Sequence, residues 1–135
     1  MFLFRVSKGF YTVYAAARSR EHGELLEFFE SLGPNLQKDC DRMLALFERV
    51  ALEGPPRNVE ISHQIKGKLF EFIQGRLRVF WFYDEGRLII CTSGLVKKGR
   101  KTPKREIDHA IMVMNKYFED KKHGEIQIIK EEVFR

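Results

Sequence analysis

The residues whose chemistry stands out first are basic side chains gathered in one short window. Between Gly86 and Arg105 the sequence holds seven basic residues and no acidic one, so this window carries +7. They are Arg87, Lys97, Lys98, Arg100, Lys101, Lys104 and Arg105. The whole chain carries +5, so the residues outside the window sum to −2. Such a local concentration of positive charge is typical of a surface that binds phosphate groups, and solubility alone does not require it.

The second half of this window also marks the start of a helix. Thr102 is a good N-cap and Pro103 suits the first helical position, so the sequence predicts that a helix begins here. Lys104 and Arg105 then lie in the first turn, where the helix dipole disfavours each cation by about 0.3–1 kcal/mol. A bound anion would reverse that cost, because backbone N–H groups, dipole and side chains would all face it. The alternative is a solvated basic loop.

A single arginine interrupts the most apolar stretch of the chain. In the run from Leu77 to Tyr83 every residue except Arg78 is apolar or aromatic, as expected for a strand buried on both faces. A buried arginine needs a partner. Arg78 could pair with Glu71 across a hairpin, which would be a structural role, or it could face an open, concave part of the sheet and bind a phosphate. The residue types alone leave both interpretations open.

No group of residues predicts a metal or cofactor site. The chain lacks ligand motifs such as H-x-x-x-H, and its two cysteines, Cys40 and Cys91, lie far apart within apolar-periodic segments. The four histidines fall in predicted loops, at helix ends or on an exposed helix face, where no other catalytic group is expected. They are His22, His63, His109 and His123. We therefore expect chemistry without metal or cofactor, in a reducing cytoplasm.

Length and composition predict one folded domain that spans residues 1–135. The chain has 44% hydrophobic and 32% charged residues, which is ordinary for a soluble globular protein. No uninterrupted apolar run is longer than 79–83, far short of the ~18 residues that a membrane span needs, so no membrane partner is expected. Basic and polar residues interrupt the first 17 residues, which argues against a signal peptide.

Hydrophobic periodicity predicts an α+β fold. The N-terminus is rich in aromatic residues that alternate loosely, which predicts a strand. Two segments with apolar residues at helical spacing follow, and they predict a helical hairpin. The apolar period then changes to two, which predicts an antiparallel β-meander. A third helix and a short apolar tail follow; the tail could be a strand or a helix. The predicted elements are a strand (2–14), two helices (22–32 and 35–52), three strands (68–73, 77–83 and 87–95), a helix from Pro103 and a tail (126–129).

These residues together resemble the RelE/ParE toxin superfamily, and most of all its phage-derived, HigB-like branch. The resemblance runs from about Leu25 to Tyr117. It rests on EFFESL at Glu27–Leu32, on the Leu-Arg-Val of 77–79 and, most specifically, on VKKGRKTPKREI at Val96–Ile107. The resemblance implies the RelE-like microbial RNase fold: an N-terminal strand, a helical hairpin, an antiparallel β-meander and a C-terminal helix.

The resemblance implies a toxin of a type II toxin–antitoxin system that cuts mRNA on the ribosome, with a helix-turn-helix antitoxin as its partner. Such a metal-independent endoribonuclease activates the 2′-hydroxyl of the RNA against the adjacent phosphate, so it must stabilise the phosphate, hold the strand and move protons. The catalytic residues would be Arg78, Lys98 and Lys97. The RNA-binding residues would be Arg100, Lys101, Lys104 and Arg105, joined by Arg76, which strand parity puts on the face of Arg78.

Two departures from the HigB-like branch bear on this expectation. Ile73 follows Glu71-Phe72 where an arginine is usual, and Ser93-Gly94-Leu95 stands where many members have His-Gly-aromatic. General acid–base catalysis therefore has no evident residue; Tyr83 and Tyr117 qualify by chemistry alone and are more typical of core packing. The alternative function is a toxin fold that does not cleave, either a gyrase inhibitor as in the ParE branch or a module that binds RNA or protein.

Overall fold

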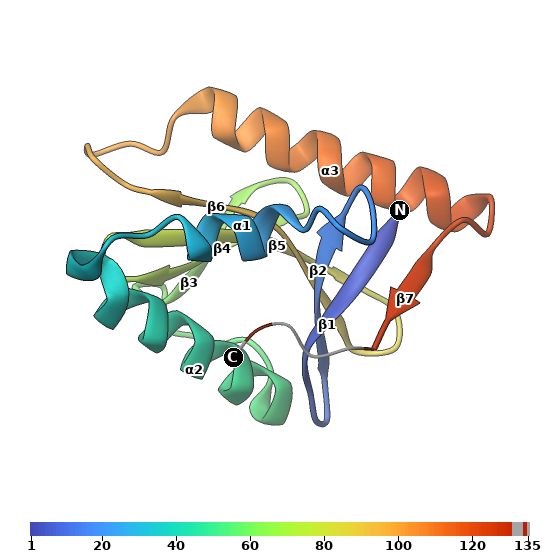
Figure 1. Ribbon diagram of the computed structural model, residues 1–135, viewed down its shortest axis with the longest axis horizontal. Coiled ribbons are helices and arrows are strands. Elements are labelled where there is room, and N and C mark those ends of the chain that lie inside the picture. Colours follow the sequence, from blue (N-terminus) through green and yellow to red (C-terminus); the bar gives the residue numbers. More distant parts are fainter. Residues whose placement is uncertain (131–133, 135) are drawn as a thin grey trace.

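The computed structural model describes residues 1–130 and residue 134, and it consists of a seven-stranded mixed sheet with helices on both faces (Figure 1). The strand order is β3-β4-β5-β6-β2-β1-β7. The strands are β1 (Phe2–Lys8), β2 (Thr12–Ala17), β3 (Ser62–Lys66), β4 (Leu69–Gln74), β5 (Leu77–Asp84), β6 (Leu88–Val96) and β7 (Gln127–Ile129). The helices are α1 (Glu24–Glu30), α2 (Gln37–Glu53) and α3 (Lys104–Lys122), with a 3-10 turn, η1 (Pro34–Leu36), before α2. The fold class is α+β, as predicted.

The N-terminal segment forms a hairpin of two strands, so the single strand predicted over 2–14 is wrong. β1 and β2 pair antiparallel along their length. Between them the chain turns at Gly9, whose N–H donates to Tyr11 O at 2.8 Å. Glycine is required there because a Cβ would lie only 2.6 Å from Ala51 O on α2. Aromatic residues occupy the turn as well as the strands, which hides the turn from hydrophobic periodicity.

α1 and α2 form the predicted helical hairpin and cover one face of the sheet. Met43, Phe47 and Val50 of α2 recur at helical spacing and are fully buried against the strands. The ring of Phe47 packs on Phe29 of α1 and on Phe72 of β4, with centroids 6.2 and 6.1 Å away. This contact ties both helices to the sheet.

β4, β5 and β6 form the predicted antiparallel meander, and β3 adds an edge strand that the prediction lacks. Most β3 residues are polar and only partly buried, so the strand has little hydrophobic signal. Successive residues of β5 point to opposite faces: Val79 and Trp81 pack toward α2, whereas Phe80 and Phe82 pack toward α3. Arg78 shares the α3 face with these two phenylalanines.

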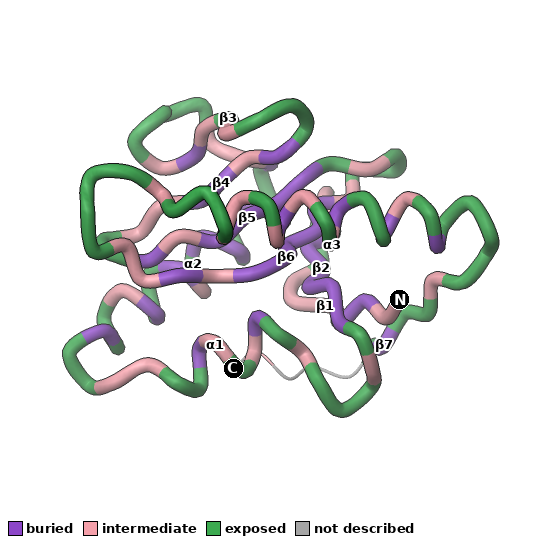
Figure 2. Tube along the Cα trace, turned by 90° about the horizontal axis from the view of Figure 1, so that it is seen from above, coloured by how far each residue is buried: buried purple, intermediate pink, exposed green. Residues whose placement is uncertain are grey.

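α3 covers the other face of the sheet. Its residues Ala110, Met114 and Tyr117 are buried against the strands, and the side of the helix that faces away from the sheet is exposed (Figure 2). The helix begins at Lys104 with Pro103 at the N-cap position, so the predicted N-cap at Thr102 is one residue too early. The carbonyl oxygen of Pro103 accepts the first helical hydrogen bonds, and no side chain caps this end.

The tail adds an outer strand to the N-terminal hairpin. β7 pairs parallel with β1, so the strand is the correct one of the two predicted possibilities. Residues 131–133 and 135, which follow it, lie outside the described residues. In the part of the chain that the structure describes, no helix is both long enough and apolar enough to cross a bilayer.

We predict that Phe47→Ala lowers the free energy of unfolding by about 3–5 kcal/mol, because it leaves a cavity between α1, α2 and the sheet. Urea denaturation followed by circular dichroism measures the change. Met112→Ala, on the exposed face of α3, is the control and should change the free energy of unfolding by less than about 0.5 kcal/mol. Equal effects of the two substitutions would contradict the assignment of the core.

Candidate functional site

Arg78 lies at the start of β5, where the β4–β5 turn holds one end of its guanidinium. Nη1 donates to the carbonyl oxygens of Gly75 and Leu77 at 2.8 and 3.0 Å. The side chain is 12% exposed. Burial lowers its pKa, and the nearby Glu71 carboxylate opposes this shift. Arg78 is therefore a fixed, mostly desolvated cation with a small opening to solvent.

Glu71 of β4 lies beside Arg78 on the same face of the sheet. Its side chain is 2% exposed, and Oε1 is 3.9 Å from Arg78 Nε, too far for a hydrogen bond. Among the described residues, neither Arg78 Nε nor Glu71 Oε2 has a hydrogen-bond partner, although both atoms are buried. The sequence leaves two roles open for Arg78, pairing with Glu71 or binding a phosphate. The structure places the Glu71 carboxylate beside Arg78, but no hydrogen bond joins the two side chains.

Opposing effects set the pKa of Glu71. Burial raises it and is the largest effect, because the charged carboxylate loses its hydration. His63, Arg78 and Lys97 lower it, in that order, because each cation favours the charged form. The net shift of the pKa is upward, so Glu71 takes up a proton more readily than an ordinary glutamate.

His63, which is partly exposed, lies beside Glu71, although the sequence predicted it in a loop with no catalytic group nearby; that prediction is wrong. β3 pairs with β4 so that His63 lies opposite Glu71, with Nε2 3.3 Å from Oε1. Its Nδ1 faces the carbonyl oxygen of Val59 at 3.1 Å. Because a carbonyl can only accept, Nδ1 supplies the hydrogen of this contact, and Nε2 faces the Glu71 carboxylate. No sequence signal could have found this pair without the pairing of β3.

The β4–β5 turn also positions Lys97, at the end of β6. The Lys97 N–H donates to Arg76 O at 2.8 Å, and the Lys97 charge acts on Glu71. Arg76 itself lies in the turn, before β5 begins, and its N–H donates to Asp39 Oδ2 of α2 at 3.1 Å. Strand parity therefore does not determine the direction of the Arg76 side chain.

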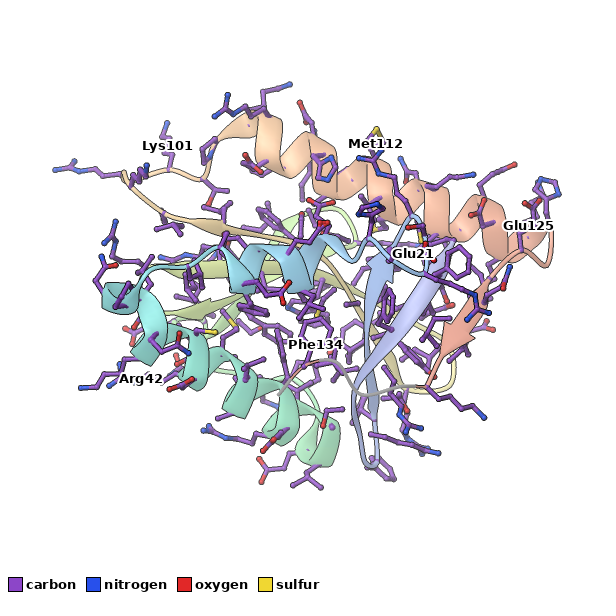
Figure 3. All side chains as sticks on the ribbon, viewed as in Figure 1. Glu21, Arg42, Lys101, Met112, Glu125 and Phe134 are labelled. Atoms are coloured by element: carbon purple, nitrogen blue, oxygen red, sulfur yellow. The ribbon has the colours of Figure 1, made fainter. Side chains whose placement is uncertain are left out.

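The loop between β6 and α3, residues 97–103, carries three exposed cations and is called the cationic loop below. Lys98, Arg100 and Lys101 are exposed there, and none forms an ion pair with a residue that the structure describes. Figure 3 shows the loop reaching outward beyond the sheet, with Lys101 labelled. Three positive charges thus remain free to meet an anion.

The first turn of α3 differs from the cationic loop, because acids accompany its two cations. Lys104 Nζ lies 2.8 Å from Asp108 Oδ2. This hydrogen-bonded ion pair holds the pKa of Asp108 below its ordinary value and the pKa of Lys104 above its ordinary value. Arg105 Nε lies 3.9 Å from Glu106. The predicted site is therefore divided into two parts: a group around Arg78 and the exposed cationic loop that begins at Lys97.

Residues 21–115 match the family described as Phage derived protein Gp49-like. The chain belongs to the Gp49-like family. The match extends from the approach to α1 into α3, so it contains Glu71, Arg78 and the cationic loop. No curated protein matches the chain. Gp49-like proteins are a RelE-like toxin family of toxin–antitoxin systems, which indicates a toxin with an antitoxin partner.

Neither tyrosine considered for proton transfer approaches Arg78 in this Gp49-like chain. Tyr117 is buried, and its hydroxyl donates to Asp84. Burial and then this hydrogen bond raise the pKa of Tyr117, so its proton is held tightly. Tyr83 lies at the far end of β5 from Arg78 and is 45% exposed, so the core position predicted for it is wrong.

The other residues singled out in the Gp49-like sequence serve packing between elements. His109 Nε2 lies 2.8 and 2.9 Å from the two carboxylate oxygens of Glu24, so this histidine connects α3 with α1. Gly94 is required under α1, because a Cβ there would lie 2.5 Å from the ring of Phe28. Its neighbours Ser93 and Leu95 are buried. The segment that departs from the HigB-like pattern therefore lies inside the core.

We predict that Glu71→Gln removes one contribution that lowers stability as the pH rises. Because the pKa of Glu71 is raised above its ordinary value of 4.5, the folded chain binds this proton more tightly than the unfolded chain does. The contribution of Glu71 to wild-type stability therefore falls as the pH rises from about 4 towards 7, and the variant lacks this loss. Chemical denaturation across this range measures the free energy of unfolding of both proteins. The value for the variant minus the value for the wild type should grow with pH. A difference that stays flat or shrinks would contradict the upward shift.

Proposed function

We propose that this chain is a type II toxin of the HigB-like branch, with a RelE-like fold over residues 1–135, and that it cuts mRNA on the ribosome in the cytoplasm. Family membership supports a toxin. The observation that carries the nuclease proposal is the cationic loop, whose first residue, Lys97, is hydrogen-bonded to the turn that leads into Arg78. A phosphodiester bound there meets exposed surface charge and one fixed, desolvated cation.

The proposed reaction uses only protein side chains and the RNA. The 2′-oxygen attacks the adjacent phosphorus, the bond from phosphorus to the 5′-oxygen breaks, and a 2′,3′-cyclic phosphate and a 5′-hydroxyl result. The 2′-hydroxyl gives up its proton, and the leaving 5′-oxygen takes one. Arg78, Lys97 and Lys98 stabilise the charge that develops on the phosphate. Because turn carbonyls already hold Arg78, its guanidinium needs little reorganisation during the reaction.

Exposed cations hold the RNA backbone in this proposal, and two of them contribute most. Arg100 and Lys101 have no acidic partner within the described residues, whereas acids partly neutralise the cations of the first turn of α3. The full set of RNA-binding residues is Arg76, Arg100, Lys101, Lys104 and Arg105. A helix-turn-helix antitoxin would silence the toxin by covering this surface with an acidic or helical segment.

The contact between Arg78 and Glu71 favours a second candidate function. A carboxylate that already lies beside the arginine weakens its attraction for a phosphate. A toxin fold that binds without cleaving, as a gyrase inhibitor or a module for RNA or protein, would need only the cationic loop. The two candidates differ in one observable, which is whether mRNA is cut after induction.

We predict that Arg78→Ala and Lys98→Ala each relieve the growth arrest caused by expression of the wild-type chain. The first substitution removes the fixed cation, and the second removes an exposed cation of the cationic loop, so cleavage should fall by about a hundredfold or more in each. Growth after induction and primer-extension mapping of mRNA ends measure the effect.

Two controls accompany this experiment. Lys122→Ala removes an exposed lysine at the other end of α3 and should leave the arrest intact. Arg78→Ala/Glu71→Gln removes both buried charges, so a loss of toxicity in this folded double variant comes from the missing cation and not from an orphaned carboxylate. Cleavage that continues in all variants would exclude the assigned residues, and arrest without any mRNA cleavage would favour the second candidate.

We also predict that Arg100→Ala/Lys101→Ala weakens binding to a fluorescent single-stranded oligo(U) and lowers its salt dependence. If both cations contact phosphates, the slope of log affinity against log salt falls by about 1.4, or roughly 0.7 for each contact. Fluorescence anisotropy at several salt concentrations measures the slope. Arg49→Ala/Lys122→Ala changes the net charge equally at exposed positions on α2 and α3 and should leave the slope nearly unchanged. Equal slopes for the two double variants would remove the loop from the RNA interface.

A further inference from the structure

Polar side chains follow one another across one edge of the sheet, on the face that α3 covers. His63 of β3, Glu71 of β4 and Arg78 of β5 come from neighbouring strands, which lie side by side in Figure 1. The strand register places His63 opposite Glu71 and places Arg78 diagonally from Glu71. The Glu71 carboxylate therefore lies between a histidine and an arginine.

The distances show which of these two neighbours Glu71 approaches more closely. Glu71 Oε1 lies 3.3 Å from His63 Nε2 and 3.9 Å from Arg78 Nε. Arg78 Nε is buried and has no hydrogen-bond partner among the described residues. A shift of the carboxylate by about 1 Å would shorten its distance from Arg78 to that of a charged hydrogen bond. The hydrogen-bonded ion pair that would occupy Arg78 Nε is therefore not formed.

The ring of His63 is held in place and also reaches solvent. Its Nδ1 faces Val59 O at 3.1 Å, and its Nε2 is directed at Glu71. The side chain is 36% exposed, and it lines a cavity of about 390 Å³ together with Glu53 and Arg57. Within the part of the chain that the structure describes, Glu71 is the only carboxylate within ion-pair distance of His63. Protons from solvent thus reach His63, whereas Glu71 is buried.

Protonation of His63 changes the attraction between Glu71 and Arg78. Because Nδ1 supplies the hydrogen to Val59 O, Nε2 is the nitrogen that gains the second proton. The imidazolium then attracts the carboxylate, whereas a neutral ring directs a lone pair at it. Of the cations around Glu71, His63 lowers the pKa of the carboxyl most, ahead of Arg78 and Lys97. His63 therefore competes with Arg78 for the same carboxylate.

We propose that His63 is a positioning residue, whose protonated ring holds the Glu71 carboxylate away from Arg78 and so leaves the guanidinium able to bind a phosphate. When His63 loses this proton, Glu71 moves towards Arg78 and competes with the phosphate. Affinity for RNA should therefore fall as the pH rises through the range in which histidine titrates. The inference rests on the proposed function in one respect, which is that Arg78 receives the phosphate of the RNA.

Binding of a fluorescent single-stranded oligo(U) to the full-length protein, measured by anisotropy at about pH 6 and about pH 8, tests the inference. We expect the wild type to bind about fivefold more tightly at the lower pH. His63→Phe keeps a ring without a charge, so it should bind at the lower pH as weakly as at the higher one. His63→Gln keeps a donor for Glu71 that does not titrate, so it should bind tightly at both.

Glu71→Gln separates positioning from a direct attraction between His63 and RNA. Without the carboxylate, the histidine has nothing to hold away from Arg78, so His63→Phe/Glu71→Gln should bind as tightly as Glu71→Gln alone. A direct contact of His63 with RNA, or damage to the fold, would instead weaken binding in both backgrounds and overturn the proposal. Wild-type affinity of His63→Phe at the lower pH would overturn it as well.

His123→Phe is the matched control. His123 also faces a glutamate, with Nε2 2.9 Å from Glu119 Oε1, but it lies at the C-terminal end of α3. This variant should keep the pH dependence of the wild type. Circular dichroism establishes that each variant is folded. If His63→Phe is not, His63→Gln decides, because a pH dependence equal to that of the wild type would overturn the proposal.

Arg78→Ala distinguishes a failure of this inference from a failure of the proposed function. If Arg78→Ala weakens binding of oligo(U) and His63→Phe does not, the inference about His63 is wrong and the assignment of Arg78 stands. If Arg78→Ala binds like the wild type at both pH values, Arg78 does not receive the phosphate, and both are wrong. We expect Arg78→Ala to weaken binding and to remove its pH dependence.

Discussion

Arg78 and Glu71 place opposite charges side by side within a sheet that is otherwise packed with apolar residues on both faces. Removing two charges from water is costly, and backbone carbonyls of the β4–β5 turn compensate one of them, Arg78. Gly75 O accepts from Arg78, Arg76 N–H donates to Asp39 of α2, and Arg76 O accepts from Lys97. One tight turn thereby fixes the buried cation, the start of α2 and the base of the cationic loop together.

That turn depends on a glycine for two independent reasons. Gly75 has a φ of 57°, in the left-handed region that side chains disfavour, and a Cβ would lie 2.4 Å from the Asp39 carboxylate. The same close approach lets Asp39 accept the Arg76 N–H. The geometry of the candidate site therefore rests on backbone groups rather than on the charged side chains that would do its chemistry. This is the arrangement expected of a preorganised electrostatic site.

Much of the fold follows from periodicity, and each exception has a physical cause. α2, α3 and the central strands carry strong apolar patterns, because each buries one face or both. Periodicity does not reveal the N-terminal hairpin, because its turn is aromatic. It does not reveal β3 either, because an edge strand of mostly polar residues lacks an apolar pattern. The cationic loop is visible in the sequence, since local charge needs no folding to be counted. The contact between His63 and Glu71 is not, because it exists only once β3 pairs with β4.

β5 carries residues to both faces of the sheet because its side chains alternate between them. Arg78 lies on the face that α3 covers, and Trp81, three residues later, packs on the face that α1 and α2 cover. The two positions differ in physical character: Arg78 keeps its charge close to solvent, whereas Trp81 stacks with Phe70 and Phe72 inside the core. The same strand therefore presents a charged group and fixes its position through aromatic packing on the opposite face.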